Sequence, residues 1–524
     1  MTCCDEAEMA EDAHLRRLAR GGMASLVGAV VSAICGVALV VVVTRTADKD
    51  TAGTFFAGTS LFLIVLAVVE LGTDSGLVRL IPQKLAHGLK ADVSAVARAA
   101  LAPVLVCSAL GAGLLWVFAS GLDHLVSGTS DSGQFAHVIR ALAVFIPIAA
   151  ALDTVLAASR GFGSMRPTVM VENIGRVSVQ VVAVAVVQFV GTDITVLAIA
   201  WSLPYLVCLG IGVWWLFRLA RRRGVRFTAG GRSSEVTREF WRFTGPRSLA
   251  RIAQVALKRA DIVMVAALAS PAEAAVYTAA TRFIVVGLLG VRAIQQVLGP
   301  QLSGLFARGD PDGVRSVFHR STTWSVMLAW PLYLGCAALA PVVLALFGHG
   351  YGSGNTVVVI LALAMLVGIG TGPVDVILLM SGRSWLSLAD NMLAVVLDVG
   401  LNLVLIPRYG IVGAAVSWSV AIVASNLVAL AQVSRYLGLL PGNQDTVRVA
   451  VSSLICFGVL PGTVALFGGP LLLGGALLLV GSGVYAAALW RWRQRLALDV
   501  LLGSLRRRTS SEGVTGDAAS AAAP

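Results

Sequence analysis

The chain has 524 residues, of which 57% are hydrophobic and only 13% are charged, and its formal net charge is +12. Soluble domains carry about 25% charged residues, so this composition excludes an ordinary soluble fold and predicts a surface that faces lipid. The basic residues lie in short groups between apolar runs, which indicates the positive-inside rule of membrane proteins rather than nucleic-acid binding.

Apolar runs long enough to cross a bilayer recur along almost the whole chain. They predict an all-α integral membrane protein of about 14 transmembrane helices. The predicted spans are 22–44, 53–71, 97–119, 136–159, 167–190, 194–217, 245–269, 274–302, 318–347, 353–380, 385–406, 411–434, 447–468 and 470–490.

The connecting segments carry an alternating charge pattern. Arg16, Arg17 and Arg20 precede the first span and place the N-terminus in the cytoplasm. The segments after spans two, four, six, eight and fourteen are basic, and the segments between them are nearly without Lys or Arg. An even number of spans with both termini in the cytoplasm is the consistent solution. The exceptions on the predicted outer side are Arg45, Lys49 and Arg408.

Short matches in the same order suggest an internal repeat. Segments 52–55 and 274–277 each open a predicted helix, and each is followed at similar spacing by a segment that ends in Gly, 85–88 and 306–309. The repeat predicts two parallel six-helix lobes plus two extra C-terminal helices. The predicted parts are a cytoplasmic N-terminal segment 1–21, an N-lobe 22–217, a basic cytoplasmic linker 218–244, a C-lobe 245–437, the last two spans within 445–490, and a cytoplasmic tail 491–524 that is basic and then disordered.

Motifs for several kinds of chemistry are missing from the sequence. It contains no GxxxxGK[ST] phosphate loop, no HExxH, no GxSxG and no His spacing typical of metal ligands. Asp48-Lys49-Asp50 lies just outside the first span, where some membrane glycosyltransferases keep acidic metal ligands. Those enzymes also have large outer loops, and every predicted outer loop here is short. We therefore predict a protein that is not an enzyme, with no catalytic residue, metal or cofactor.

Charged side chains inside a membrane are costly and mark functional sites. In the predicted span 245–269, Arg247, Arg251, Lys258 and Asp261 project within an arc of about 80° at 100° per residue. Such a stripe predicts a watery cavity or a helix partner. Alternatively, Lys258 and Asp261 form a local ion pair and both arginines lie at the interface. Arg259 points about 120° away from Arg247 and needs a separate explanation.

Neighbouring spans add further cations. Arg282 lies in the span 274–302, and Arg79 follows the second span. A cationic cavity between two lobes without an ATP site predicts a secondary transporter for an anionic or amphipathic cargo, and Arg binds phosphate oxygens bidentately. Other intramembrane charges are predicted to form mostly structural pairs: Glu70, Asp74, Arg140, Asp153, Glu172, Arg176, Asp375, Asp390 and Asp398.

Several segments, in order, carry a family resemblance. They are 76–82 (Gly-Leu-Val-Arg-Leu-Ile-Pro), 160–163 (Arg-Gly-Phe-Gly) with Glu172-Asn173, 259–262 (Arg-Ala-Asp-Ile) with Val276-Tyr277, and 406–410 (Ile-Pro-Arg-Tyr-Gly). This set resembles the polysaccharide flippase family of the multidrug/oligosaccharidyl-lipid/polysaccharide exporter superfamily. The resemblance covers most of residues 20–437.

The resemblance implies a flippase that moves a polyprenyl-diphosphate-linked oligosaccharide or polysaccharide precursor across the bacterial cytoplasmic membrane by alternating access. Arg79, Arg251, Lys258 and Arg282 are then the candidates for contacting the diphosphate. Asp261 is the candidate for coupling to a cation or for balancing the neighbouring charges. The expected partners are membrane lipids, the lipid-linked sugar and envelope polysaccharide assembly proteins, with no nucleic acid.

Three alternatives remain open at this point. A multidrug exporter of the same superfamily has twelve helices as a rule, and the two extra helices and the cationic stripe disfavour it. A peptidoglycan-precursor flippase suits fourteen helices equally well. A membrane glycosyltransferase or polymerase is the alternative of a different class, and the short outer loops disfavour it.

Overall fold

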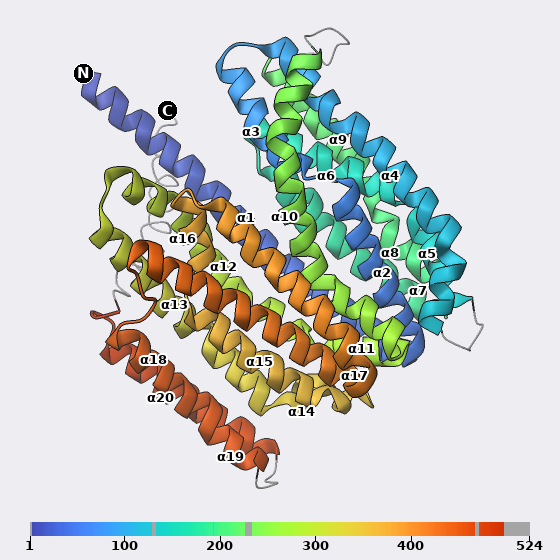
Figure 1. Ribbon diagram of the computed structural model, residues 1–524, viewed down its shortest axis with the longest axis vertical. Coiled ribbons are helices and arrows are strands. Elements are labelled where there is room, and N and C mark those ends of the chain that lie inside the picture. The colour runs from blue at the N-terminus through green and yellow to red at the C-terminus, as the bar shows by residue number, and fades with distance from the viewer. Residues whose placement is uncertain (1–2, 128–132, 192, 226–232, 467–470, 497–524) are drawn as a thin grey trace, which may run out of the picture. The chain divides into compact units, whose positions relative to one another are not determined.

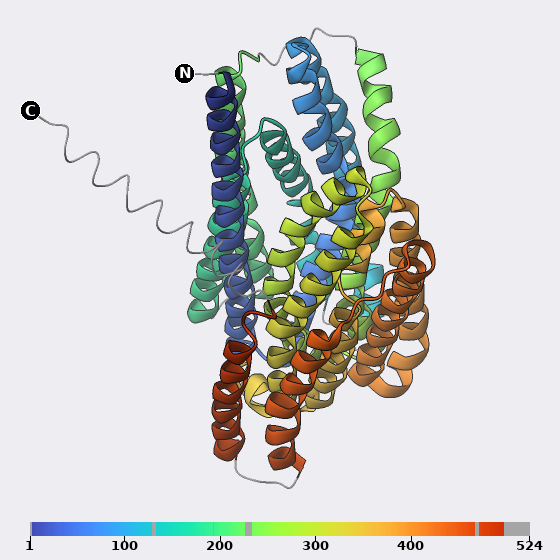
Figure 2. The same cartoon turned by 90° about the vertical axis from the view of Figure 1, so that its left-hand side faces the viewer.

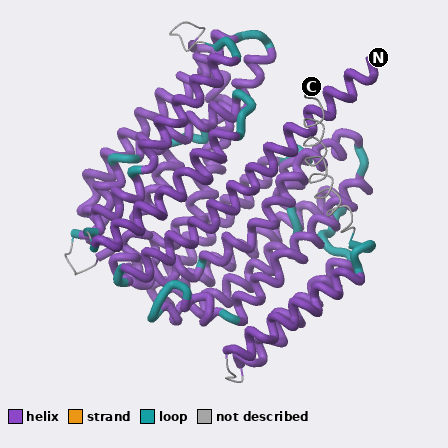
Figure 3. Tube along the Cα trace, turned by 180° about the vertical axis from the view of Figure 1, so that it is seen from behind, coloured by secondary structure: helices purple, strands orange, loops and turns teal. Residues whose placement is uncertain are grey.

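A computed structural model of the protein describes residues 3–127, 133–191, 193–225, 233–466 and 471–496. Across these ranges the chain forms helices and no β-strand (Figure 3). The predicted all-α class is therefore confirmed. The disorder predicted from Thr509 onwards concerns a part of the chain outside the described residues.

Ten helical segments make up the first part of the chain (Figure 1). They are α1 (Cys3–Thr46), α2 (Lys49–Val69), α3 (Thr73–Ala86), α4 (Lys90–Ser127), α5 (Gln134–Ala143), α6 (Ile146–Gly161), the π-helix η1 (Thr168–Arg176), α7 (Val177–Val190), α8 (Ile194–Ser202) and α9 (Pro204–Arg222). The break between α2 and α3 falls at Leu71 and Gly72, which both have positive φ.

Thirteen segments follow in the second part of the chain. They are α10 (Ser233–Leu268), α11 (Pro271–Ala280), α12 (Arg282–Arg308), α13 (Pro311–Ala338), α14 (Ala340–Ala345), the 3₁₀ turn η2 (Tyr351–Gly354), α15 (Asn355–Gly370), α16 (Val374–Met380), α17 (Ser384–Leu437), α18 (Gln444–Ser453), the π-helix η3 (Leu454–Val459), α19 (Leu460–Leu466) and α20 (Leu471–Arg491). Together with the earlier segments they establish a multi-pass membrane protein.

Within the described residues, the predicted spans fall on helical segments. Among the described helices, ten are long and apolar enough to cross a membrane, or eleven when α5 and α6, bent by 42° at their junction, are taken as one span. Two predicted spans share α17, and the predicted seventh span lies on the strongly charged α10. The count of 14 and the orientation in the membrane therefore stay predictions.

Helix α17 consists of two helices joined at one residue. Gly410 has φ 56° and ψ −135°, which is not helical. A Cβ on Gly413, just beyond this break, would collide with the carbonyl oxygen of Leu405. The connection predicted between spans 385–406 and 411–434 is therefore a very tight turn that depends on glycine.

The chain divides into two compact units. The first comprises Met1–Leu289, Pro341–Leu361 and Trp385–Ser425, and the second comprises Gly290–Ala340, Ala362–Ser384 and Asn426–Pro524. The units follow packing contacts, whereas the lobes were predicted from sequence repeats. The boundaries of the lobes stay a prediction.

In the first unit, α10 and α11 pack against α2, and α10 also packs against α3 and α4. Small residues allow this close packing. A Cβ on Gly76 of α3 would collide with Thr244 and with the ring of Phe240 on α10. Phe240 belongs to a buried core that includes Leu77, Ile81 and Val96. Close contact thus fixes α10 against the first helices of the chain.

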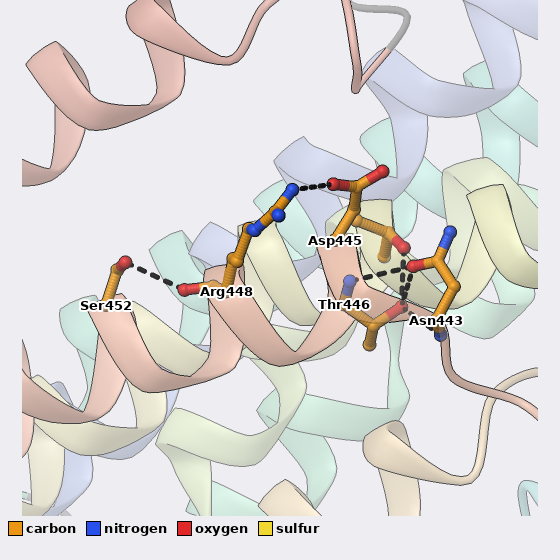
Figure 4. A network of polar contacts seen from close by, with 6 residues as sticks. Asn443, Asp445, Thr446, Arg448 and Ser452 are labelled. Atoms are coloured by element: carbon orange, nitrogen blue, oxygen red, sulfur yellow. Dashed lines mark hydrogen bonds and ion pairs between the residues drawn. The ribbon is translucent and has the colours of Figure 1, made fainter.

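In the second unit, α13 packs against α18 and η3, and α20 packs against α19 (Figure 2). The start of α18 is closed by a capping box, in which the Asn443 side chain accepts from the Thr446 backbone amide at 2.9 Å. Arg448 forms an ion pair with Asp445 at 2.9 Å in the same turn (Figure 4). These local bonds fix the N-terminus of α18.

The predicted repeat has a counterpart in backbone conformation. Gly88 follows α3 with φ 73°, and Gly309 follows α12 with φ 65°. Both glycines end a helix in the left-handed conformation, and a new helix begins one or two residues later.

Candidate functional site

A buried polar cluster lies around Asp261 in the first unit. Asp261 is contributed by α10, Tyr277 by α11, and Asp398 and Asn402 by the first half of α17. Tyr277 donates its hydroxyl to Asp261 Oδ2 at 2.8 Å, and Asn402 Nδ2 donates to Asp261 Oδ1 at 2.9 Å. Asp398 and Asn402 are fully buried, and Asp261 is 4% exposed. The cluster joins three helices in the interior.

The two carboxyl groups in the cluster lie close together. Asn402 Nδ2 donates to Asp398 Oδ1 at 3.2 Å as well as to Asp261 Oδ1, so the two carboxyl groups share one amide donor. Two buried carboxylates around one amide group repel each other when both are charged. At least one positive ion, a proton or a metal cation, is thus needed to neutralise the pair.

Two oxygen atoms of the cluster lack a partner. Asp398 Oδ2 and Asn402 Oδ1 are buried and accept no hydrogen bond. Oxygen donors are the ligands of hard cations. No group of three or more His, Cys, Asp or Glu that could hold a metal ion occurs among the described residues. With only two carboxylates, the donor set fits a proton or a monovalent cation better than a multivalent metal.

Asp261 does not pair with Lys258. Its carboxylate accepts hydrogen bonds from Tyr277 and Asn402. Lys258 is exposed, as are Arg251 and Arg247 on the same helix. The predicted stripe on α10 therefore has a buried acidic end and an exposed basic part.

Arg259 and Arg282 form a pair of like charges. Arg259 lies on α10, Arg282 begins α12, and their charges are close enough to repel each other. Both are partly buried. Arg282 Nε donates to the Thr278 carbonyl oxygen at 3.1 Å, and within the described part of the chain neither arginine has a carboxylate partner. Two neighbouring cations without a counter-charge are a natural site for an anion.

A hydroxyl group next to this pair is also without a partner. Thr278 Oγ1 is buried and makes no hydrogen bond, while the backbone of Thr278 holds Arg282. Guanidinium groups bind phosphate oxygens through parallel N–H groups, and a hydroxyl can donate to a further oxygen. Arg259, Arg282 and Thr278 thus offer donors suited to a phosphate group.

Arg251 lies near acidic residues rather than near Arg282. Its charge acts on Glu70, the residue that ends α2. Glu70 is 7% exposed, and the charge of Asp153 on α6 also acts on it. Glu70, Asp153 and Arg251 thus lie in one charged region of the first unit.

Arg79 makes its contact with α10. Its Cζ lies 4.0 Å from the centroid of the Phe243 ring, and Arg247 Cζ lies 4.4 Å from the same centroid. The four cations predicted for the diphosphate thus do not form one cluster. Arg79 lies beside Phe243, Arg251 near Glu70, and Arg282 near Arg259.

One predicted structural pair is present in the first unit. Arg176 forms an ion pair with Glu172 one turn earlier, donates to Gln180 at 2.8 Å and stacks on Tyr205. Gln180 in turn donates to the Trp201 carbonyl oxygen at 2.8 Å. This network joins η1, α7 and α8 and explains two intramembrane charges without any ligand.

The three basic residues on the predicted outer side bind backbone oxygens. Arg45 Nε donates to the Leu346 carbonyl at 2.8 Å, and Lys49 Nζ donates to the Gly350 carbonyl at 2.8 Å. Arg408 donates to the carbonyl of Val404 at 3.2 Å. The exceptions to the charge pattern therefore have local structural partners.

The sequence did not show that Asp398, Asn402 and Arg259 belong to buried polar sites. Asp398 and Asn402 are four residues apart and thus on one helix face, a spacing that could have marked a polar site. Arg259 was placed on a separate face from Arg247, but no pattern within one helix could identify Arg282 as its neighbour.

Known proteins share sequence and fold with this chain. The profile of a family described as polysaccharide biosynthesis protein matches residues 18–306. A curated relative, "Probable low-salt glycan biosynthesis flippase Agl15" of Haloferax volcanii, is 22% identical over 209 residues, which are 40% of this chain and 44% of that protein. The chain thus spans less than half the length of this relative.

Solved structures share the fold. A lipid II flippase MurJ in an inward closed conformation superposes with a TM-score of 0.70 at 13% identity, over 90% of this chain and 99% of that one. An inward-facing multidrug resistance MATE family transporter of the MOP superfamily has a TM-score of 0.65 at 16% identity, over 78% and 95%. These relatives are described as flippases or transporters rather than as enzymes, in line with the prediction.

Proposed function

Because this chain belongs to the polysaccharide biosynthesis protein family, we propose that it is a flippase for a polyprenyl-diphosphate-linked oligosaccharide or polysaccharide precursor. It acts in the bacterial cytoplasmic membrane, alongside envelope polysaccharide assembly proteins. The relative of Haloferax volcanii described as a glycan biosynthesis flippase supports a glycan cargo. The expected membership of the flippase superfamily is confirmed by the family match and by the shared fold.

The observation that carries the proposal is the pair of Arg259 and Arg282. Two partly buried guanidinium groups that repel each other are costly in a membrane protein unless an anion binds them. A diphosphate supplies two negatively charged groups and many acceptor oxygens, and it binds Arg bidentately. Arg282 was predicted for this role from the sequence, and Arg259 joins it.

The remaining predicted cations take roles along the path of the cargo. Arg251 and Lys258 are exposed on α10 between Arg247 and Asp261. They guide the anionic headgroup, and Arg79 contacts it from α3, beside Arg247 of α10. An apolar cationic drug gains nothing from these residues, so the lipid-linked anion suits the charges better than a drug does.

Transport against a gradient needs an energy source. The Asp261 cluster couples transport to an ion gradient by binding a proton or a monovalent cation. Its carboxyl pair is buried on three helices and has two unused oxygens. Binding of the ion neutralises the carboxyl groups of Asp261 and Asp398. Release of the ion favours another arrangement of α10 and α17. Alternating access then follows from the ion and the cargo favouring different arrangements.

The test is mass spectrometry of lipids that co-purify with the full chain in detergent. We expect a polyprenyl-diphosphate saccharide enriched over bulk lipid in the wild type and lost in the double variant Arg259→Gln/Arg282→Gln. Arg238→Gln, an exposed residue of α10 far from the pair, is the matched control and should keep the lipid. If the wild type and both variants carry bulk phospholipid alone, the proposed cargo is wrong. A peptidoglycan precursor would instead identify the rival flippase.

A further inference from the structure

Phe243 holds two arginines that come from different helices. Arg79 of α3 and Arg247 of α10 have their Cζ atoms within 4.4 Å of the centroid of this one ring. A guanidinium group over an aromatic face is attracted by the ring quadrupole. The ring therefore offsets part of the repulsion between two cations and keeps them near each other.

Both guanidinium groups remain available to a ligand. Arg79 and Arg247 are exposed, and Phe243 is only partly covered. No carboxylate forms an ion pair with either arginine in the ranges that the structure describes. Stacking uses the flat face of a guanidinium and leaves its N–H edge available for hydrogen bonds. Two exposed arginines beside one ring thus keep N–H groups that can donate to a ligand.

The meeting of α3 and α10 is fixed by tight packing. A Cβ on Gly72 would lie 2.8 Å from Cα of Ser248. A Cβ on Gly76 would likewise collide with the side chains of Thr244 and Phe240. Lys84 and Glu239 add an ion pair between the two helices at 2.7 Å. Since these contacts flank Phe243 on both sides, the two arginines are positioned before any ligand arrives.

This arrangement is separate from the buried arginine pair. Arg247 and Arg259 are 12 residues apart on the continuous α10, which corresponds to about 18 Å along the helix axis. A single diphosphate cannot touch both places. The positive-inside rule assigns the Arg79–Arg247 end of α10 to the cytoplasmic side, next to the basic linker.

We propose that Arg79, Phe243 and Arg247 form a phosphate clamp, a second anion site that receives the phosphate groups of a lipid headgroup before they reach Arg259 and Arg282. The identity of the headgroup as the cargo diphosphate rests on the proposed function. The same chemistry would also take the phosphate of an anionic membrane phospholipid. Phe243 is a positioning residue that aligns the two arginines.

The test is equilibrium binding to the purified full chain with three probes: inorganic diphosphate, polyprenyl diphosphate and phosphatidylglycerol. We expect Arg79→Gln and Arg247→Gln each to weaken diphosphate binding at least about tenfold, since each removes charge-assisted hydrogen bonds. Phe243→Leu should weaken it by a smaller factor, because both charges remain but lose their alignment. Arg238→Gln, with the same loss of charge on the same helix, should bind as the wild type does.

Each result has one meaning. If Arg79→Gln, Arg247→Gln and Phe243→Leu all bind inorganic diphosphate as tightly as Arg238→Gln does, the clamp is wrong. A loss for polyprenyl diphosphate but not for phosphatidylglycerol identifies the cargo as the ligand, and an equal loss for both identifies a general site for anionic lipids. If the clamp binds diphosphate while purified protein carries only phospholipid, the clamp stands and the proposed cargo fails. Matching gel-filtration profiles of all variants exclude misfolding.

Discussion

Gly53 of α2 and Pro271 of α11 meet backbone to backbone, so that a Cβ at position 53 would collide with the carbonyl oxygen of Pro271. A rotamer change cannot relieve this collision, because the obstacle belongs to the main chain. The contact lies where α2 and α11 pack together in the first unit.

We therefore predict that Gly53→Ala lowers the stability of the protein by about 1–3 kcal/mol, the cost typical of overpacking. Thermal unfolding in detergent measures the change. Gly36→Ala is the control, because a Cβ there meets no atom within 4 Å, and a helical Gly→Ala change is otherwise favourable. Equal unfolding temperatures for the two variants would show that α2 and α11 do not approach as described.

The acidic cluster predicts a specific defect in Asp398→Asn. The amide can still donate to Asp261, so the fold should survive, but the pair loses one ionisable group. We expect transport in proteoliposomes to lose its response to an imposed ion gradient. Proton and sodium gradients, applied separately to the wild type, identify the ion.

Asp50→Asn is the control for the same charge change, because Asp50 is exposed at the start of α2. It should respond to the gradient as the wild type does. A wild-type response in Asp398→Asn would remove the cluster from the coupling mechanism.

The ion pair of Glu172 and Arg176 should be important for stability. Their side chains are 21% and 14% exposed, and Arg176 also contacts Gln180 and Tyr205. Glu172→Gln leaves the arginine without its counter-charge, so we predict a loss of about 3–5 kcal/mol of unfolding free energy.

A second ion pair, between residues three positions apart on α13, provides the comparison. Asp312 and Arg315 are 88% and 51% exposed, and Asp312→Asn should cost at most about 1 kcal/mol. Denaturation in mixed detergent compares both variants with the wild type. Similar losses in the two variants would mean that Glu172 is not in the low-dielectric interior.

Asp48 gives the chain a pH-dependent helix cap. Partial burial alone would raise the pKa of Asp48, but the hydrogen bonds from the backbone and side chain of Thr51 and from nearby backbone groups outweigh it and lower that pKa below its ordinary value. A carboxyl group with a lowered pKa stabilises the fold above its unfolded pKa of about 4 and loses this contribution as the pH falls through the folded pKa.

The variant Asp48→Ser tests this cap, because serine is also a good N-cap and does not titrate. Wild-type stability relative to Asp48→Ser should be highest at pH 6 and should decrease as the pH is lowered towards 3. Thermal unfolding over this range measures the difference. A constant difference would show that Asp48 is not the titrating group.

The sequence alone was sufficient to predict where the helices lie and which face of α10 carries the basic residues. Each apolar run predicted as a span coincides with helical structure, because a backbone in lipid has to satisfy its own hydrogen bonds. The angular positions of Arg247, Arg251 and Lys258 on α10 follow from 100° per residue, and all three are exposed.

Contacts between helices could not be predicted in this way. Asp261 and Asn402 are 141 residues apart and meet only through the packing of α10 against α17. The neighbours Arg259 and Arg282 likewise depend on the rotation of two helices about their own axes, which packing decides. The sequence predicted one charged stripe on α10, and the structure leaves its three basic residues exposed and buries Asp261.

Arg45 and Lys49 hold the segment 345–350 entirely through its main chain, at the carbonyls of Ala345, Leu346 and Gly350. Every residue type offers the same carbonyl oxygen, so the contacts at Ala345 and Leu346 do not depend on the side chains there, whereas Gly350 has positive φ and a Cβ on it would collide with Lys49 Nζ. Selection would instead act on the two cations and on the length of the segment. In a homologue that has lost both cations, the acceptor segment would be the place to look for an insertion or deletion.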